Sequence, residues 1–450
     1  MAIFNVVGLR SPRTFTGRLV ALGAAVTTLI LVYTYASPLS SFPNIIPNIT
    51  YPKPTCSPES YSNGIWSFRP RTNQTSLTSK EDALMFAGFD GCASSREVDW
   101  HLAIDVEEKW DRFPDVSSWE WVPGETCQGL RSFDPAALVK ELVEDGGWLL
   151  IGDSVTENHF FSISCSLYPH VIATPYYAPG SSWDRGWPQN LYLNPDSPIV
   201  SSIAFPPGFN ITGTPLVTFR RIDILFSKAE LNALYHTNHP YFSPNDTLFG
   251  DEGVWTSPIR EYLDLFFSPI PKGNYGTMIV STGGHWTTRV FEYFLDKDKE
   301  DSGYGIDNVL EFFEFAMLRW TAEVQTEIWK EQKRLGVKSR AKAKKVVVRA
   351  YLPGHEDCHS FRKAWTKIEP FKWNWFNWGS IWDFNARFEN ILSLRKKYPD
   401  IYFLPIDRPA RLRPDAHAAG DCLHYMTGAG VLEGWTHYLW HFISREVSKN

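Results

Sequence analysis

The stretch Trp148-Leu149-Leu150-Ile151-Gly152-Asp153-Ser154 decides the fold of this chain. A short apolar run ends abruptly in Gly-Asp-Ser, and a helix-like segment follows from Val155 to Leu167. The pattern predicts a buried strand that delivers Ser154 to its carboxyl end, at the N-terminus of a helix. Ligands of open α/β sheets bind at that edge, and a backbone N–H there can help to hold an oxyanion. Ser154 is therefore a candidate nucleophile.

The far end of the chain supplies the partners that a serine nucleophile needs. Asp421-Cys422-Leu423-His424 places an aspartate and a histidine three residues apart, just before an amphipathic run from Val431 to Ile443. His424 can take the proton of Ser154 while Asp421 orients the imidazole. Gly-Asp-Ser also suits a helix N-cap, and an aspartate beside a cysteine also suits a turn. The two motifs together favour the catalytic interpretation.

Further apolar runs predict the rest of the fold. Strands are expected at Leu216 to Phe226, Tyr275 to Ser281, Lys345 to Leu352 and Ile401 to Ile406, and helices at Pro135 to Glu144 and Asn308 to Arg334. Strands that alternate with helices predict an α/β fold with a doubly wound, mostly parallel sheet. Gly283-Gly284-His285 and Pro353-Gly354-His355 follow two of these strands, so we expect them at the same edge as Ser154.

That edge supplies candidates for the remaining parts of a site. We expect the backbone N–H groups of Ser154 and of Gly283 or Gly284 to hold an oxyanion. His285, Trp286 and Asn158 are candidates for substrate contacts, and packing of the turn is the alternative role for His285 and Trp286. Asp153 is expected to cap the helix rather than to react.

Composition limits the class of protein. The chain has 450 residues, of which 43% are hydrophobic and 21% charged, so it can bury a full core and is not disordered. Its net charge of −6 argues against a nucleic-acid partner. Among its 19 tryptophans, those between Trp365 and Trp382 suit either the core or a stacking surface for sugar rings.

The N-terminus predicts a membrane anchor. Arg10, Arg13 and Arg18 precede an uncharged run from Leu19 to Ala36, which is near the short limit for crossing a bilayer. The basic flank is expected to stay cytosolic, which gives a single-pass type II topology in the Golgi or secretory-pathway membrane. A cleaved signal peptide is the alternative. We expect residues 1–18 to be a cytosolic tail, 19–36 the anchor, 37–55 a stem, and 56–450 a luminal catalytic domain.

Sequons and cysteines agree with a luminal domain. Four N-glycosylation sequons, at Asn48, Asn73, Asn210 and Asn245, lie beyond the anchor. The six cysteines are even in number and lie on the same side, although spacing alone leaves their pairing open. A metal site is the rival use of cysteines, but the sequence has no Cys-x-x-Cys spacing, and we expect no bound metal or cofactor.

The motifs resemble a known family. The Gly-Asp-Ser serine with a late Asp-x-x-His is similar to the SGNH/GDSL hydrolase superfamily, and more closely to the PC-esterase, or trichome birefringence-like, polysaccharide O-acetyltransferases. The resemblance runs in the family's order through Trp119-Glu120-Trp121-Val122-Pro123, Cys127, Leu130-Arg131-Ser132-Phe133-Asp134, Gly152-Asp153-Ser154 with Asn158, Ser162 and Cys165, Thr282-Gly283-Gly284-His285-Trp286, Arg349 to His355, Arg413 to His417, and Asp421 to His424. It covers the chain from about Cys56 onward.

This resemblance implies chemistry and disulfides. It implies a Ser154–His424–Asp421 triad that carries an acetyl group from a donor, acetyl-CoA or another acetyl carrier, to a glycan acceptor. It also implies the bridges Cys56–Cys127, Cys92–Cys165 and Cys358–Cys422. An esterase of the same fold and a non-catalytic glycan-binding wall protein are the alternatives.

The chain departs from the family at three places. Ser281 or Thr282 stands where the family has an asparagine, Met426 stands where plant members have a cysteine, and Glu157 stands where they have an arginine. These departures predict a distant, fungal-type branch rather than a plant enzyme.

Overall fold

The computed structural model describes residues 24, 27, 55–178, 180, 182–243, 245–296, 305–336, 343–352, 354–370 and 375–447. The chain divides into two units, Met1–Lys53 and Pro54–Asn450. The expected tail, anchor and stem therefore lie outside the described residues, apart from Ala24, Thr27 and Thr55. Within the described ranges, no helix combines the length and apolar character that a membrane span requires.

The second unit is built on a seven-stranded sheet in the order β4-β5-β6-β3-β7-β8-β9. Its strands are β3 (Gly147–Gly152), β4 (Val171–Thr174), β5 (Gln189–Leu193), β6 (Val217–Arg221), β7 (Tyr275–Val280), β8 (Lys345–Arg349) and β9 (Ile401–Leu404). The five strands from β6 to β9 in this order pair in parallel, with β3 between β6 and β7. The predicted α/β class with a mostly parallel sheet is confirmed.

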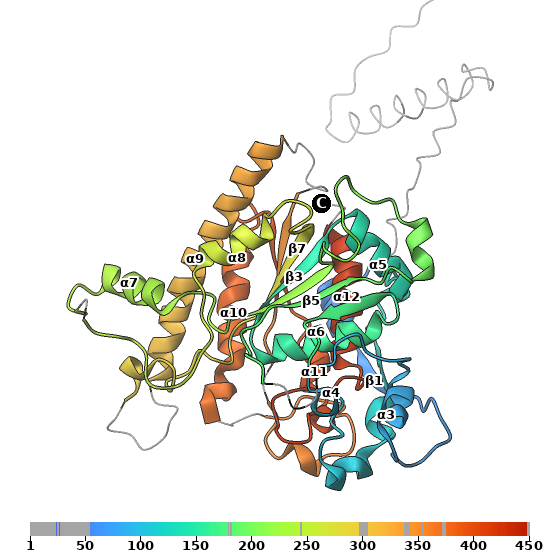
Figure 1. Cartoon of the computed structure of the whole chain (residues 1–450). Helices are drawn as coiled ribbons and strands as arrows, with labels where there is room; N and C mark the ends of the chain where they lie inside the picture. Colours follow the sequence, from blue (N-terminus) through green and yellow to red (C-terminus); the bar gives the residue numbers. More distant parts are fainter. Residues whose placement is uncertain are drawn as a thin grey trace, which may run out of the picture. The chain divides into compact units, whose positions relative to one another are not determined.

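Helices cover both faces of the sheet (Figure 1). They are α2 (Pro58–Ser62), α3 (Lys80–Ala87), α4 (Val98–His101), α5 (Pro135–Glu144), α6 (Ser154–Ser166), α7 (Lys228–Asn238), α8 (Ile259–Phe266), α9 (Ile306–Leu335), α10 (Ile381–Leu392), α11 (Arg408–Arg411) and α12 (Val431–His441). Every residue of β3 is buried, as expected for a parallel strand covered on both sides.

Two pairs of helices fix these layers. Ser162 of α6 donates to Glu433 of α12 at 2.6 Å, and Glu433 also accepts from the backbone N–H groups that precede α12. On the other side, Trp320 of α9 packs edge-on against Phe388 of α10, with ring centroids 5.8 Å apart. The helix that begins at Ser154 is thus held against the helix that follows His424.

The sheet differs from the sequence prediction at one edge. The strands β4 and β5 pair antiparallel with each other, and β5 pairs antiparallel with β6. Both are short and carry no long apolar run, so periodicity does not distinguish them from loops. The strand expected at Leu216 to Phe226 ends at Arg221, because the backbone turns there and Asp223 pairs with Trp255 of a distant loop.

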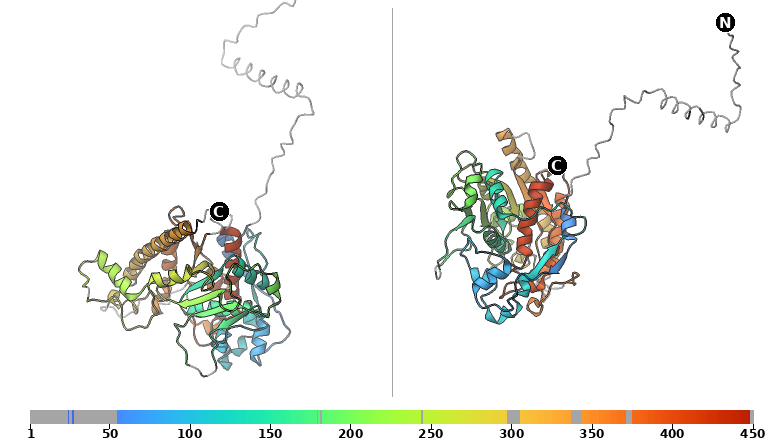
Figure 2. Two further views of the ribbon diagram at one scale, coloured as in Figure 1. Left: turned by 45° about the horizontal axis from the view of Figure 1, so that its top comes forward. Right: turned by 90° about the vertical axis from the view of Figure 1, so that its right-hand side faces the viewer.

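The N-terminal segment wraps onto the core. Its strands β1 (Ile65–Phe68) and β2 (Trp119–Val122) form a separate two-stranded sheet. Tyr61 stacks on Tyr438 of α12 with ring centroids 4.1 Å apart, and Figure 2 shows this blue segment beside the red C-terminal helix. The bridges Cys56–Cys127, Cys92–Cys165 and Cys358–Cys422 are all present, which confirms the implied pairing.

Candidate active site

Ser154 is presented at the junction of the central strand and α6. Asp153 caps the helix, and its carboxylate accepts the backbone N–H of Val155 at 3.0 Å. Glycine is required at position 152, directly before Asp153, because a Cβ there would collide with Thr156 and with the carbonyl of Ser281. Ser154 is largely buried at the end of the strand, with 7% of the residue exposed, and it lines a cavity.

The three predicted triad residues meet in space. His424 Nε2 lies 2.7 Å from Ser154 Oγ, and His424 Nδ1 lies 2.9 Å from Asp421 Oδ2. The histidine can therefore accept the serine proton on one nitrogen while the other donates to the aspartate. Residues 270 positions apart in sequence share this hydrogen bond.

Asp421 is held in its charged form. Burial opposes ionisation, but the charge and hydrogen bond of His424 outweigh it. The backbone N–H groups of Leu423 and His424 add two further bonds, each 2.8 Å, to Oδ1. Together they hold the pKa of this carboxyl below its ordinary value, so Asp421 is an anion that can stabilise an imidazolium.

A buried histidine pair supports the loop that carries His424. His355 Nδ1 lies 2.7 Å from His417 Nε2, while the outer nitrogens of the pair face the carbonyls of Arg411 and His424. A hydrogen bond to each carbonyl and one between the two rings would together require three protons on the ring nitrogens. Burial lowers the pKa of His355 to about 4 and that of His417 as well, so the pair holds two. The carbonyl of His424 does not require a proton from His417, because it already accepts the backbone N–H of Ala418 at 2.7 Å.

A cavity of about 250 Å³ opens in front of the triad. Ser154, Asp421 and His424 line one side of it. Its other walls are formed by Glu252, Gly284, His285, Thr287, Val290, Tyr351, Phe376, Trp378, Cys422 and Leu423. Trp378 stacks on Phe376 with ring centroids 5.6 Å apart, so one member of the tryptophan-rich tract lies beside the nucleophile.

The oxyanion candidates lie around the nucleophile. Among the described residues, no acceptor pairs with the backbone N–H of Ser154. Gly284 lines the cavity, and its carbonyl accepts from Trp378 Nε1 at 3.3 Å, which fixes the peptide that follows. Gly283 has a φ of 156°, at the edge of the region that favours glycine, and does not line the cavity. Ser281 and Thr282 are buried away from it.

The three candidates for substrate contacts differ in whether they reach the cavity. His285 lines the cavity with 24% of its side chain exposed. Trp286 is fully buried and stacks on Phe291 with centroids 4.9 Å apart, so it packs the turn. Asn158 is also buried and lies 3.0 Å from the ring of His101, outside the cavity lining. The substrate-contact role is thus open to His285 but is not supported for Trp286 or Asn158.

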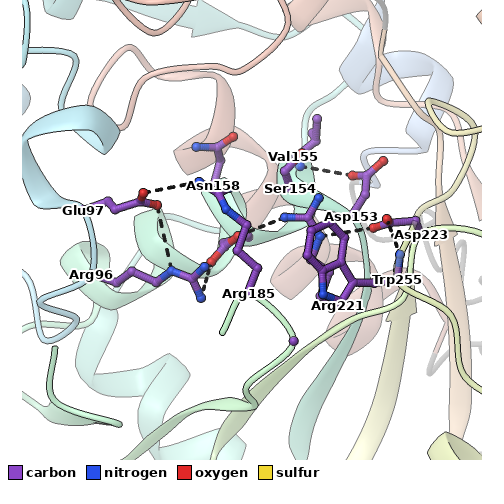
Figure 3. A network of polar contacts seen from close by, with 12 residues as sticks. Arg96, Glu97, Asp153, Ser154, Val155, Asn158, Arg185, Arg221, Asp223 and Trp255 are labelled. Carbon is purple, nitrogen blue, oxygen red and sulfur yellow. Dashed lines mark hydrogen bonds and ion pairs between the residues drawn. The ribbon is translucent and has the colours of Figure 1, made fainter. Parts of the chain in front are cut away.

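Sequence reasoning missed a second group of polar residues around Ser154. Tyr351 donates to Asp153 at 2.7 Å from the end of β8, and Asp223 lies 3.7 Å from His285. Glu157 pairs with Arg96 at 2.6 Å and with Arg221 at 3.8 Å. Figure 3 labels both arginines below Ser154. The arginine pair inside an apolar strand, Arg220-Arg221, was the available signal for buried charge.

Two other features are alternative candidates for a site. A larger cavity, about 730 Å³, lies at the opposite edge of the sheet, beside Trp148, Tyr275 and Lys345 at the amino ends of the strands. Cys358, His359 and Cys422 lie close enough to hold a metal, but both sulfurs are already bonded to each other. Neither feature competes with the triad as a site of acyl chemistry.

Comparison of the sequence with protein-family models gave no match, and comparison with curated proteins gave none either.

We predict that the Cys358–Cys422 bridge supports activity as well as stability. Replacing both cysteines by alanine frees the loop that holds Asp421 and His424. Removing a native disulfide costs about 2–5 kcal/mol, so the free energy of unfolding should fall by that amount. The rate of acylation by an activated acetyl ester should fall too. Urea unfolding and stopped-flow acylation, at a temperature where the variant is folded, measure the two effects.

The matched control is the double alanine variant of Cys56 and Cys127. The two bridges span similar separations, 64 and 71 residues, so their losses of stability should be similar. The control bridge does not touch the triad loop, and its removal should leave the acylation rate of the folded protein close to normal. Equal losses of activity in both variants would show that the effect is only global.

Proposed function

We propose that this chain is a glycan O-acetyltransferase that works through an acetyl-serine intermediate. The observation that carries the proposal is the contact of His424 with Ser154 at 2.7 Å and with Asp421 at 2.9 Å, inside a cavity. A serine, a histidine and an ionised aspartate in this geometry are the parts of a nucleophile for acyl groups. The motif resemblance favours an SGNH-like fold and the PC-esterase family.

In the first half-reaction, Ser154 Oγ attacks the carbonyl carbon of the acetyl donor while His424 Nε2 takes the hydroxyl proton. The negative charge on the acyl oxygen is met by the backbone N–H of Ser154 and by that of Gly284 or Gly283. When the tetrahedral intermediate collapses, His424 returns the proton to the leaving group of the donor. The acetyl group is left on Ser154.

In the second half-reaction, a sugar hydroxyl attacks the acetyl-serine and gives its proton to His424. Collapse transfers the acetyl group to the sugar oxygen, and His424 returns the proton to Ser154. The cavity, about 250 Å³, is slightly smaller than the pockets of about 300–1,000 Å³ that hold drug-sized ligands, which suits a small acyl group with one sugar residue. The stacked pair Phe376 and Trp378 offers an apolar wall to a sugar face.

We place the catalytic domain in the lumen of the Golgi or another secretory compartment, behind a type II anchor. Three disulfides are the form that cysteines take in oxidising compartments. The asparagines of three sequons, Asn73, Asn210 and Asn245, are exposed and accessible to glycan attachment.

The first test concerns the nucleophile. Ser154→Ala should abolish formation of the acetyl-enzyme, seen by intact mass spectrometry after incubation with an activated acetyl ester. Loss of the serine or of His424 should lower the rate by about 10⁶-fold, and Asp421→Asn by somewhat less, since triad members act as a unit. Ser166→Ala, at the other end of α6, is the matched control and should acetylate normally.

Addition of glycans to the acetylated protein then distinguishes the alternatives. Transfer of the acetyl group to a glycan supports the transferase. An acetyl-serine that passes only to water, whatever glycan is offered, would identify an esterase. Undiminished acetylation of Ser154→Ala would rule out the covalent mechanism and favour the glycan-binding role.

The topology gives a second test. Full-length protein made in a eukaryotic host should lose apparent mass on a gel after glycosidase treatment, and replacing Asn73, Asn210 and Asn245 by glutamine should remove most of that shift. In sealed vesicles the C-terminal domain should resist added protease. A protease-sensitive, unglycosylated domain would contradict the luminal assignment.

A further inference from the structure

His285 lies in the wall of the cavity between two buried carboxylates. Its Nδ1 lies 3.3 Å from Asp153 Oδ2, and its Nε2 lies 3.7 Å from Asp223 Oδ2. Both carboxylates are fully buried. Because each ring nitrogen faces an anion, both favour a bound proton, which only the imidazolium form provides.

The same two carboxylates end a longer series of charges that runs beneath Ser154. We call this series the alternating charge chain, and Figure 3 labels its members Arg185, Glu97, Arg96, Arg221, Asp223 and Asp153. Its members, in order of contact, are Arg185, Glu97, Arg96, Glu157, Arg221, Asp223, His285 and Asp153. Signs alternate along it, and its successive contacts measure between 2.6 and 3.9 Å.

Charge balance favours the protonated, imidazolium form of His285. Burial raises the pKa of Asp223 and of Glu157, while their arginine partners favour the ionised forms. With all four carboxylates ionised and His285 neutral, three guanidinium groups leave one negative charge in excess. Asp153, Asp223 and Glu157 are almost completely buried, and an uncompensated buried charge costs several kcal/mol. A proton on His285 makes the alternating charge chain neutral.

The other groups around His285 do not reverse this balance. Arg221 opposes its charge, but it is already engaged with Asp223 at 3.3 Å. Tyr351 donates to Asp153, and Ser154, Glu252, Asp421 and His424 share the cavity with His285. Burial disfavours the imidazolium, yet the carboxylates of Asp223 and Asp153 outweigh it and raise the pKa of His285.

We propose that His285 is a positioning residue, held as an imidazolium, that neutralises the carboxylates beside Ser154 so that negative charge can develop on the acyl oxygen. The inference rests on the proposed acyl transfer. His285 and Ser154 line the same cavity, and the carboxylate of Asp153 lies 3.3 Å behind the His285 ring. Like charges at such distances repel strongly in a poorly solvated site. A neutral His285 would leave that repulsion uncompensated.

The proposal predicts the direction of a pH effect. A histidine whose pKa is raised in the folded state contributes stabilisation that is complete below about 6.5, its ordinary pKa, and is lost as pH rises through the raised value. Acylation should therefore decline on the alkaline side as His285 loses its proton.

The first experiment follows acylation of the full chain by p-nitrophenyl acetate as a function of pH. His285→Gln should lower kcat roughly 100-fold with little change in KM, and the alkaline decline should disappear, because the interaction exists only in the transition state. Tyr351→Phe is the matched control, since it removes a neutral hydrogen bond to Asp153 and should keep the alkaline decline. A decline that survives in His285→Gln would overturn the proposal.

The second experiment reads the proton directly and needs no activity. In Ser154→Ala, the ¹⁵N and ¹³C NMR shifts of labelled histidines should show His285 titrating above about 6.5, and Asp223→Asn should lower that midpoint. A ring that is neutral at pH 6 would overturn the inference even if acetyl transfer is real. A raised midpoint in a protein that never acetylates Ser154 would instead count against the proposed function alone.

Discussion

The carboxylate of Asp153 is the point at which the site is joined to the sheet. It caps α6 through the N–H of Val155, accepts the hydroxyl of Tyr351 from the end of β8, and faces His285 from the loop after β7. Three neighbouring strands are thus tied to one oxygen pair directly before the nucleophile. Its hydrogen bonds hold the pKa of Asp153 below its ordinary value despite complete burial. The position of Ser154 depends on this one ionised group.

Burying one carboxylate has consequences several residues away. An isolated ion in a protein interior is expensive, so each buried charge requires an opposite charge nearby. The need for an opposite charge passes from Asp153 to His285 and then to Asp223 and Arg221. The far end of the series is the most exposed, with 39% of the Arg185 side chain open to solvent. Trp183 and Trp255 cover the guanidinium groups of Arg96 and Arg221, each at 3.9 Å. Part of the tryptophan content therefore shields charge rather than binding substrate.

Sequence predicted those parts of the molecule that local patterns encode. The strand ending at Ser154, the helix after it and the other four parallel strands have apolar runs of clear period, and the late Asp-x-x-His supplied the triad partners. The disulfide pairing came from resemblance, since spacing does not choose among pairings. Tyr351, Asp223 and the pairing of Glu157 with Arg96 were missed, because contacts between charged side chains far apart in sequence leave no periodic signal. The antiparallel strands β4 and β5 were missed because they are short and only partly buried.

The distance along the chain between Ser154 and His424 also orders events during synthesis. Ribosomes make the N-terminal part first, and domains begin to fold as they emerge. The nucleophile is therefore made, and can be placed on its strand, long before its base exists. Contacts of such long sequence separation form late, because the intervening chain must be ordered first. A partly made or truncated chain holds Ser154 without His424, so the proposed acyl transfer requires a molecule in which the C-terminal segment is already in place.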